Sequence, residues 1–389
     1  MKKKVLYITT VSGFLPQFLE NDVKLIQHMG YEVHYASNFY HPVYYFDKKE
    51  LEAKGIILHQ INIEKSPARL GKNVQAILQL RRIIDEEEIN MIHCHNPMGG
   101  AAGRCAAKIS RQRPYVIYTA HGFHFYKGAP VKNWLCFYPV ERFLARWTDA
   151  LVTINGEDYL RAADFHLNKG GFVKQIHGVG VDLQRFHHRP ELVKSKRKEL
   201  GIPEKAFHIV TAAELNENKN QRVVIEAIEQ MKNADIYYSI CGTGPEKKIL
   251  EKLIKQKHLE QYIRLLGYRT DMEEILQTAD VFAFPSLREG LGIAAVEALA
   301  CEVPLIVADN RGTREYAEDG GNGIVCPAEN VVAFRRAIEY LYGDAEYRSR
   351  LSRECRQTAE RFSIQETAIR MQEIYRKADQ ASSLQENIH

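Results

Sequence analysis

The sequence predicts an α/β protein made of two doubly wound domains, each with a parallel sheet covered by helices on both faces. Three observations support this class. Short β-branched runs alternate with longer helical patterns, which is typical of parallel sheets because each crossover needs a helix. The alternation begins again after residue 207, and a turn-rich, charged passage at 178–207 separates the two series. The length of 389 residues suits two domains.

The first series begins with VLYITT at 5–10, which we interpret as a buried strand. Its apolar run is short and no small-residue cleavage site follows, so we do not expect a signal peptide. The same pattern predicts further strands at 31–37, 55–61, 91–96, 115–120 and 150–154. Helical patterns lie up to Met29 and at 72–88, 99–110 and 132–147.

The second series repeats this order after the linking passage. Its predicted strands are 208–215, 234–242, 262–268, 280–286 and 303–309. Its predicted helices are 221–232, 245–256, 271–278, 292–301 and 330–342. We therefore expect one domain over 1–185 and another over 186–364. Ligands of open parallel sheets bind beyond the carboxyl ends of the strands, so the chemistry should lie in the loops that follow them.

Composition excludes several classes of protein. Apolar residues make up 45% and charged residues 26%, as in ordinary globular proteins. The net charge of +4 gives no indication of a nucleic-acid partner. The seven cysteines are scattered without a C-x-x-C, which argues against a disulfide framework or zinc site and favours a reducing compartment. The longest apolar stretch, 291–308, contains charged residues and a proline, so we expect a soluble intracellular protein without a membrane span.

The segment FPSLREGLGIAAVEALACEVPLIVAD at 284–309 is the most informative one. A strand ends before Glu289, and a helix begins near Gly290 and Gly292. Glycines at a helix start allow close backbone approach, and free N–H groups there favour an anion. Glu289 and Glu297 can face one cleft, where carboxylates accept hydrogen bonds from sugar and ribose hydroxyls. Taken alone, either glutamate is better explained as a solvated side chain at a buried helix start.

The run E-G-L-G-I-A-A-V-E-A-L-A within this segment resembles the paired-glutamate signature of the family 4 retaining glycosyltransferases. These enzymes have the GT-B fold, in which two Rossmann-like domains face each other across a cleft. The resemblance covers nearly the whole chain. Other segments resemble family elements in the expected order, at 177–186, 212–220, 241–250 and 265–286. The resemblance also implies that a C-terminal helix near 365–378 crosses back to the first domain, so that residues 365–389 pack on that domain.

The resemblance implies a role for several residues. Glu289 would bind the transferred sugar and Glu297 the ribose, while Lys219 would neutralise the leaving diphosphate as a catalytic cation. Backbone N–H groups of Gly290 to Gly292 would hold sugar hydroxyls and phosphate. The other donor-binding residues implied are Gly13, Gly242, Tyr268, Leu291 and Arg269. No divalent metal and no other cofactor is expected, because cations and a helix start stabilise the diphosphate.

One position departs from the family pattern. Many members carry a second diphosphate-binding arginine where this chain has Glu214. A carboxylate cannot hold phosphate. Either Arg288 or Arg222 supplies the second charge, or Glu214 turns away and contacts another group.

The first domain contributes the segment YTAHGFHFYKGAP after a strand. By the resemblance, His121 lies near the reacting sugar and the acceptor phosphate as a catalytic residue; the alternative is a packed loop histidine. His124 and Lys127 follow as partners for an anionic acceptor. The neighbouring His93, Cys94 and His95 do not form a metal site, because successive residues of a strand point to opposite faces.

The segment at 128–150 is aromatic and basic, and contains both tryptophans. Such a helix can lie on a membrane surface or bury its aromatic face in a core. We expect the first half, with Lys127, Lys132 and Trp134, to contact lipid headgroups. The block around it resembles the family branch that builds bacterial capsule, exopolysaccharide or O-antigen units on polyprenyl diphosphate at the inner membrane face.

Together these features predict a retaining glycosyltransferase. It would move a hexose or N-acetylhexosamine from a nucleotide sugar, most simply a UDP-sugar, to a polyprenyl-diphosphate-linked glycan. It would be cytoplasmic and peripheral at the inner face of the plasma membrane. Two alternatives stay open: a GT-B sugar-nucleotide epimerase or phosphorylase, and a non-catalytic partner subunit, which Glu214 favours and Glu289, Glu297 and Lys219 argue against.

Overall fold

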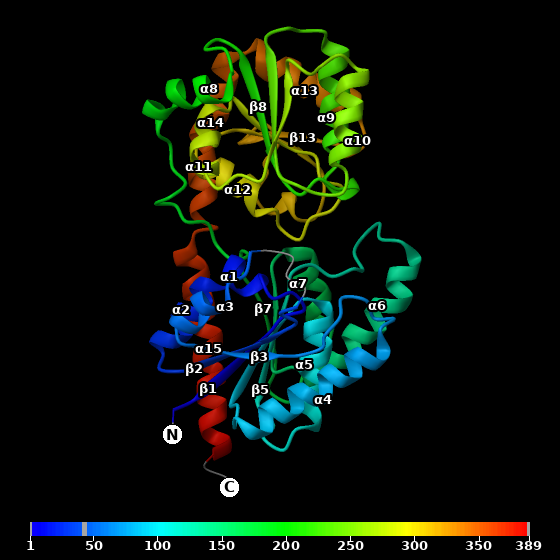
Figure 1. Cartoon of the computed structure of the whole chain (residues 1–389), viewed down its shortest axis with the longest axis vertical. Helices are drawn as coiled ribbons and strands as arrows, with labels where there is room; N and C mark the ends of the chain where they lie inside the picture. Colours follow the sequence, from blue (N-terminus) through cyan, green and yellow to red (C-terminus); the bar gives the residue numbers. More distant parts are fainter. Residues whose placement is uncertain (1, 41–44, 387–389) are drawn as a thin grey trace. The chain divides into compact units, whose positions relative to one another are not determined.

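The computed structural model describes residues 2–40 and 45–386 and divides into two compact units (Figure 1). Unit 1 comprises Met1–Val179 with Gln365–His389, and unit 2 comprises Gly180–Ile364. Val181 forms a parallel bridge with Ser363, so the chain enters unit 2 slightly before the expected boundary at 185.

Unit 1 is built on a seven-stranded parallel sheet in the order β3-β2-β1-β4-β5-β6-β7. Every strand that the sequence predicted here is present, and the sequence analysis missed β7, whose half-buried FVKQ has no apolar run. The strands are β1 (Lys4–Ile8), β2 (Glu32–Ser37), β3 (Ile56–Gln60), β4 (Met91–His95), β5 (Tyr115–Ala120), β6 (Ala150–Thr153) and β7 (Phe172–Gln175).

Helices cover both faces of this sheet. They are α1 (Phe14–Phe18), α2 (Glu20–His28), α3 (Lys48–Ala53), α4 (Leu70–Glu86), α5 (Pro97–Ile109), α6 (Val131–Leu144), α7 (Gly156–Ala163) and α15 (Ile364–Glu386). The last helix belongs with unit 1 because Tyr375 Oη lies 2.9 Å from Tyr7 Oη of β1. In addition, Lys3 Nζ donates to Asp379 Oδ1 at 2.6 Å. These contacts join the end of the chain to its first strand.

A buried ion pair attaches α6 to the rest of unit 1. Arg104 of α5 is fully buried, and its Nη2 donates to Glu141 Oε2 of α6 at 2.7 Å. The guanidinium also lies 4.1 Å from the ring centroid of Tyr118 in β5. Because a buried charge without its partner is costly, this pair fixes which face of α6 turns inward.

Unit 2 has a six-stranded parallel sheet in the order β10-β9-β8-β11-β12-β13. All strands predicted for the second series are present, with β13 added at the edge. They are β8 (Phe207–Ala212), β9 (Ile236–Cys241), β10 (Ile263–Gly267), β11 (Val281–Phe284), β12 (Leu305–Ala308) and β13 (Gly323–Cys326). The prediction of two doubly wound α/β domains is thus confirmed.

The helices of unit 2 include one inside the passage that the sequence suggested to be a linker. They are α8 (Val193–Leu200), α9 (Gln221–Met231), α10 (Lys247–Gln256), α11 (Met272–Ile275), α12 (Ile293–Ala300), α13 (Val331–Gly343) and α14 (Ala345–Glu360). Arg197 of α8 is buried and donates to Thr278 O and to Asp280 Oδ2, each at 2.8 Å. The charged passage therefore packs as part of unit 2. Over the part of the chain that the structure describes, no helix is both long and apolar enough to cross a membrane.

Candidate functional site

The strand order of unit 2 reverses between β8 and β11, and two predicted residues meet beside this point. Lys219 follows β8, Glu289 follows β11, and Lys219 Nζ lies 2.6 Å from Glu289 Oε1. Both side chains are largely buried, with 20% and 10% of their surfaces exposed. A switch point at the carboxyl ends of parallel strands is where doubly wound sheets bind ligands. The structure thus brings together the two residues expected at the diphosphate and the sugar.

The loop that carries Lys219 is held by its own side chains and by a glycine. The Asn216 side chain accepts a hydrogen bond from the Lys219 N–H, which starts a short turn of 3₁₀ helix. Gly242, at the end of β9, lies against this loop with φ of 145°. A Cβ on Gly242 would sit 1.9 Å from Ala213 O, so no other residue fits there. This close approach explains the glycine that the sequence analysis placed at the donor site.

The loop that carries Glu289 rests on residues that the sequence analysis did not single out. Asn310 Nδ2 donates to Ser286 O at 2.9 Å, and Arg311 Nε donates to Glu289 O at 3.3 Å. Gly312 packs directly against Glu289. These residues follow β12, the next strand of the sheet. A buried-strand end followed by N-R-G-T was the signal available in the sequence, but it became meaningful only once the strand order was known.

Gly292 precedes α12 and has φ of 93°, a left-handed conformation that favours glycine. A Cβ there would meet the ring of Phe284 and the hydroxyl of Tyr316. Leu291 beside it is buried, so its contribution to a ligand is limited to its backbone. The hydroxyls of Tyr316 and Ser286 are buried without hydrogen-bond partners among the described residues. The helix start is therefore a tightly packed element with polar groups beneath it.

Glu297 lies within α12, half-buried. Burial raises the pKa of its carboxyl to about 7, which the nearby Arg185 partly opposes and Glu273 reinforces. Arg185 Nη2 itself forms an ion pair with Glu273 Oε2 at 2.8 Å. The ionised carboxylate only accepts hydrogen bonds and accepts them more strongly, whereas the protonated carboxyl also donates one. The hydrogen-bonding character of this side chain therefore changes with pH near neutrality.

Glu214, which departs from the family pattern, forms a hydrogen bond within its own loop. Its side chain is exposed, and Glu214 Oε2 accepts a hydrogen bond from Asn216 Nδ2 at 3.0 Å. Arg222 is occupied by Glu226 at 3.0 Å on the surface of α9. Arg288 is exposed, stands directly before Glu289, and forms no ion pair within the described residues. Of the two arginines considered, Arg288 is the one that forms no ion pair with a described residue.

Tyr268 and Arg269 follow β10 and differ in their surroundings. Tyr268 is exposed. Arg269 binds Asp271 through two hydrogen bonds and Glu199 through a third, at 2.6–3.0 Å. Those carboxylates raise its pKa above the usual range. The structure thus commits the Arg269 guanidinium to a surface ion-pair cluster, which differs from the expectation that it contacts the donor.

The candidate residues of unit 1 are histidines, whereas Lys219 and Glu289 of unit 2 carry charges. His121 directly follows β5 and is half-buried, and its Nε2 lies 3.0 Å from Nδ1 of His95, the last residue of β4. Burial lowers the pKa of His121 to about 4 and that of His95 well below its ordinary value. Both rings are therefore neutral at pH 7. In the sequence, His95 lies at the end of a predicted strand, but no pattern there indicates a role for it.

The strand order of unit 1 reverses between β1 and β4, and Gly13 lies in the loop after β1. The next residue, Phe14, packs its ring edge against His121 with centroids 5.0 Å apart. Asn96 after β4 accepts from Thr10 N at 3.2 Å and has φ of 62° with ψ of 156°. This conformation is costly for a residue with a Cβ, and such strain tends to occur at functional sites.

The residues expected on the acceptor side lie around α6. Lys127 is exposed, while the His124 ring packs on Phe137 at 4.7 Å. Trp134 is partly buried against Phe125 and Tyr138 in the core of unit 1. The prediction that Trp134 faces lipid therefore differs from the structure. The reason is that the Arg104–Glu141 pair turns the tryptophan side of the helix inward.

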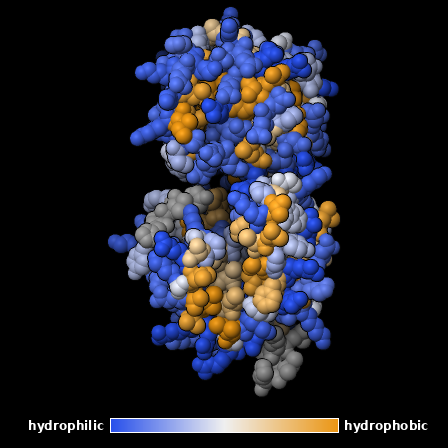
Figure 2. All heavy atoms as spheres, turned by 90° about the vertical axis from the view of Figure 1, so that its right-hand side faces the viewer, coloured by the Kyte–Doolittle hydropathy of each residue, from blue (hydrophilic) through white to orange (hydrophobic). Residues whose placement is uncertain are grey.

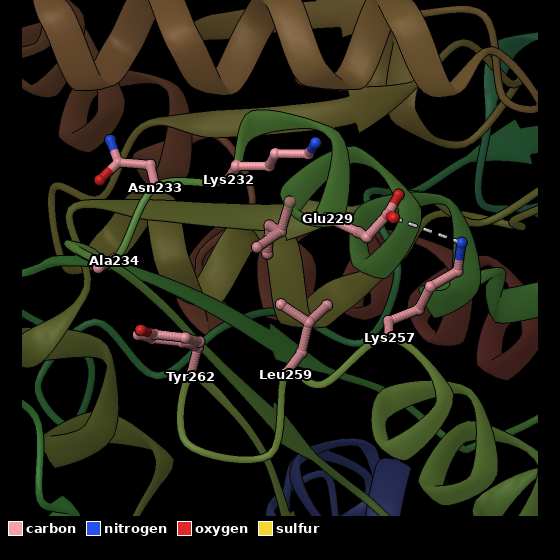
Figure 3. A pocket seen from close by; sticks show the side chains of 8 residues that line it. Glu229, Lys232, Asn233, Ala234, Lys257, Leu259 and Tyr262 are labelled. Carbon is pink, nitrogen blue, oxygen red and sulfur yellow. Dashed lines mark ion pairs between the residues drawn. The ribbon is translucent and has the colours of Figure 1, made fainter.

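Two further sets of residues bear on the chemistry. Across residues 2–40 and 45–386, no group of three or more His, Cys, Asp or Glu side chains is arranged to hold a metal ion. A hollow of about 270 Å³ in unit 2 is lined by polar side chains that include Glu229, Lys232 and Lys257 (Figure 3). It lies before β9 and β10, at the amino ends of the strands. Ligands of such sheets bind at the other edge, so we assign this hollow no part in the site.

Comparison with known proteins places the chain in a family. Residues 193–358 match the family described as glycosyl transferases group 1, and residues 4–155 match the family described as glycosyl transferase 4-like. The chain is 39% identical to the putative glycosyltransferase EpsD of Bacillus subtilis over 379 residues, which cover 96% of this chain and 97% of that protein.

A second relative is UDP-Gal:alpha-D-GlcNAc-diphosphoundecaprenol alpha-1,3-galactosyltransferase of Escherichia coli, 27% identical over 79% of this chain and 80% of that protein. Among solved structures, Anabaena Alr3699/HepE in complex with UDP shares the fold with a TM-score of 0.78 and 19% identity, covering 97% of this chain and all of that one. Sucrose-phosphate synthase of Thermosynechococcus elongatus has a TM-score of 0.79 with 16% identity, covering 98% and 100%. The chain is therefore a glycosyltransferase of family 4 with the GT-B fold, related to enzymes of exopolysaccharide synthesis.

Proposed function

We propose that this glycosyltransferase moves a hexose or N-acetylhexosamine from a UDP-sugar to a polyprenyl-diphosphate-linked glycan, with retention of the anomeric configuration. The observation that carries the proposal is the Lys219–Glu289 pair beside the switch point of unit 2. A cation and a carboxylate 2.6 Å apart suit a ligand with an anionic end and a hydroxyl-rich end. A nucleotide sugar has both, and it would separate the pair on binding.

The proposed step follows from these positions. The acceptor hydroxyl forms the new bond to the anomeric carbon while the bond to the UDP oxygen breaks. The leaving diphosphate takes up the hydroxyl proton, so no protein base is needed. Lys219 and the N–H groups at the start of α12 stabilise the negative charge that develops on the diphosphate. Glu289 accepts hydrogen bonds from the sugar, and Arg288 supplies the second cation.

We also propose that transfer requires no divalent metal. Metal ions in transferases of this chemistry neutralise the diphosphate. Here Lys219, Arg288 and the helix start offer compensating positive charge at the same place. The proposal predicts equal turnover with and without EDTA.

The identity of donor and acceptor is supported by the relatives. The E. coli relative is named for a UDP-galactose donor and a diphosphoundecaprenol acceptor. Two further relatives, both named putative colanic acid biosynthesis glycosyltransferase WcaL, come from Salmonella typhimurium and E. coli. Because this chain aligns with most of the galactosyltransferase, we extend a lipid-linked acceptor of that chemistry to it.

We further propose that α6 places unit 1 on the cytoplasmic face of the membrane. Its outward surface carries exposed apolar side chains, of which Leu135 is 72% exposed and Phe143 50%. The exposed charged residues of α6 and the turn after it are all basic: Lys132, Arg142 and Arg146. Figure 2 shows hydrophobic surface gathered on the side of unit 1 where α6 lies. An apolar strip flanked by cations suits anionic phospholipid.

The test is transfer in vitro. The protein would be incubated with UDP-glucose, UDP-galactose or their N-acetyl derivatives and a short-chain polyprenyl-diphosphate N-acetylglucosamine. We expect one UDP-sugar to yield a disaccharide whose new linkage keeps the α configuration, as read from its proton coupling. An inverted linkage would contradict retention. Epimerised donor, or product that depends on free phosphate, would favour the alternative enzyme classes.

A further inference from the structure

Two pairs of histidines hydrogen-bond ring to ring in unit 1. His34 Nδ1 of β2 lies 2.8 Å from His59 Nε2 of β3, and His95 Nδ1 of β4 lies 3.0 Å from His121 Nε2 after β5. Burial lowers the pKa of all four imidazoles. Each neutral ring carries one proton, so within each pair one ring donates and the other accepts.

In the first pair a carboxylate fixes the direction of the hydrogen bond. His34 Nε2 lies 3.1 Å from Glu32 Oε1, and an ionised carboxylate can only accept. The proton of His34 is therefore on Nε2, and its Nδ1 must accept. His59 is then the donor of the pair.

In the second pair, no described carboxylate accepts a hydrogen bond from His95 Nε2. Nε2 of His95 is buried and has no hydrogen-bond partner among the described residues. A proton on this atom would leave a buried N–H without an acceptor, which is rarer in proteins than an unsatisfied acceptor. The cheaper arrangement puts the proton of His95 on Nδ1. His121 Nε2 then accepts, and the proton of His121 is on Nδ1.

The surroundings keep the His95 ring in this orientation. It stacks on Tyr7 at an interplanar angle of 8°, and its centroid lies 4.1 Å from that of His93. His93 is itself held by hydrogen bonds to Tyr375 and Thr119 at 2.9 and 2.8 Å. His95 therefore presents Nδ1 to His121 from a fixed position.

We propose that His95 is a positioning residue that holds His121 in the Nδ1–H tautomer, so that His121 donates a hydrogen bond to a substrate oxygen and does not act as a base. The inference rests on the proposed function, since it concerns how His121 meets the substrates. His121 is half-buried, and its Nδ1 forms no hydrogen bond within the described residues. A donor at this atom suits a step in which the diphosphate takes the proton.

The test is ¹⁵N NMR of the imidazole rings in the full chain, which reports the tautomer directly. We expect His121 to carry its proton on Nδ1, with His34 carrying it on Nε2 as the internal reference. Replacing His95 with Leu should shift His121 toward the Nε2–H form and lower turnover about tenfold, the value of one hydrogen bond. His95→Gln, whose amide N–H can donate to His121, should keep the tautomer and most of the turnover.

His59→Gln is the matched control, because it alters the other histidine pair and should leave both properties of His121 unchanged. An unchanged His34 signal shows that the His95 variants are folded, and an unchanged His93 signal shows the same for His59→Gln. If UDP-glucose shifts the His121 Nδ1–H signal, the accepting oxygen belongs to the sugar donor. If polyprenyl-diphosphate N-acetylglucosamine shifts it, the oxygen belongs to the sugar acceptor. If neither compound shifts the signal, His121 does not donate a hydrogen bond to a substrate. His121 protonated on Nε2 in the wild type, or unaffected by His95→Leu, contradicts the proposal. A protein that binds neither substrate and transfers no sugar contradicts the proposed function, whichever tautomer is found.

Discussion

The carboxyl edges of the two sheets carry different chemistry. In unit 2 the edge holds opposed charges, with Lys219 bound to Glu289. In unit 1 it holds neutral aromatic groups, with His121 bound to His95 and covered by Phe14. Charges suit a diphosphate whose negative charge increases during reaction, whereas neutral donors suit hydroxyls. Under the proposed function, the edge of unit 2 would bind the anionic donor and the edge of unit 1 would make uncharged contacts.

We expect the largest effect at the buried ion pair between Arg104 and Glu141 in unit 1. Glu141→Ala would leave Arg104 buried without its partner and should destabilise unit 1 by about 3–5 kcal/mol. Denaturant unfolding followed by circular dichroism would measure this loss. Glu86→Ala, which breaks an exposed pair with Arg82, is the control and should cost at most about 0.5 kcal/mol. Equal effects would mean that the buried pair is not essential to unit 1.

The next largest effect concerns the charged edge of unit 2. Lys219→Ala should lower kcat of sugar transfer about 10²–10³-fold, because the leaving diphosphate loses a preorganised cation. Arg222→Ala removes a surface arginine that is already bound to Glu226 and should leave kcat unchanged. Steady-state kinetics with the preferred UDP-sugar would compare the two. A Lys219 variant with normal turnover would show that the diphosphate is neutralised elsewhere.

Much of the fold and part of the site could be predicted from the sequence. Strand ends and the Glu289–Glu297 segment are local patterns, so they were visible along the chain. The support of Glu289 by Arg311 and the pairing of Arg269 with Glu199 were not, because each joins segments that only the folded sheet brings together. The orientation of Trp134 was missed for the same reason: it depends on an ion pair between two helices.

The two edges should also differ in their response to pH. The pKa of Glu297 is raised to about 7, so between pH 6 and 8 its carboxyl gains charge and UDP affinity should rise about tenfold. His121, with a pKa of about 4, stays neutral over this range and should contribute no change. Titration calorimetry at several pH values would measure the slope, and Glu297→Gln should leave only the part that comes from UDP, whose terminal phosphate titrates at about pH 6.

The same raised pKa makes an opposite prediction for the free protein. Because folded Glu297 retains a proton that the unfolded chain releases at its ordinary pKa, stability should fall as pH rises between about 4.5 and 7. Glu297→Gln should remove this contribution. A variant that keeps the wild-type pH dependence of both affinity and stability would show that Glu297 does not titrate as described.

An effect of similar size is expected at the surface of α6. Leu135→Ser with Phe143→Ser removes two exposed apolar side chains and should weaken binding to phosphatidylglycerol vesicles about tenfold. Ile249→Ser on α10 removes an exposed apolar side chain from unit 2 and serves as the control. Vesicle sedimentation would measure binding. Unchanged sedimentation with a smaller oligomer in gel filtration would assign the surface to a second copy of the chain.

The proposed function depends on binding of the nucleotide sugar at the charged edge of unit 2. Calorimetric titration with UDP, GDP and ADP in EDTA tests it most directly, using the wild type beside Glu297→Ala and the Arg222→Ala control. We expect UDP to bind without metal and the other two nucleotides to bind more weakly. Glu297→Ala should lose at least about tenfold in affinity, whereas Arg222→Ala should not. Equal binding by both variants, or binding of no nucleotide by the wild type, would contradict it.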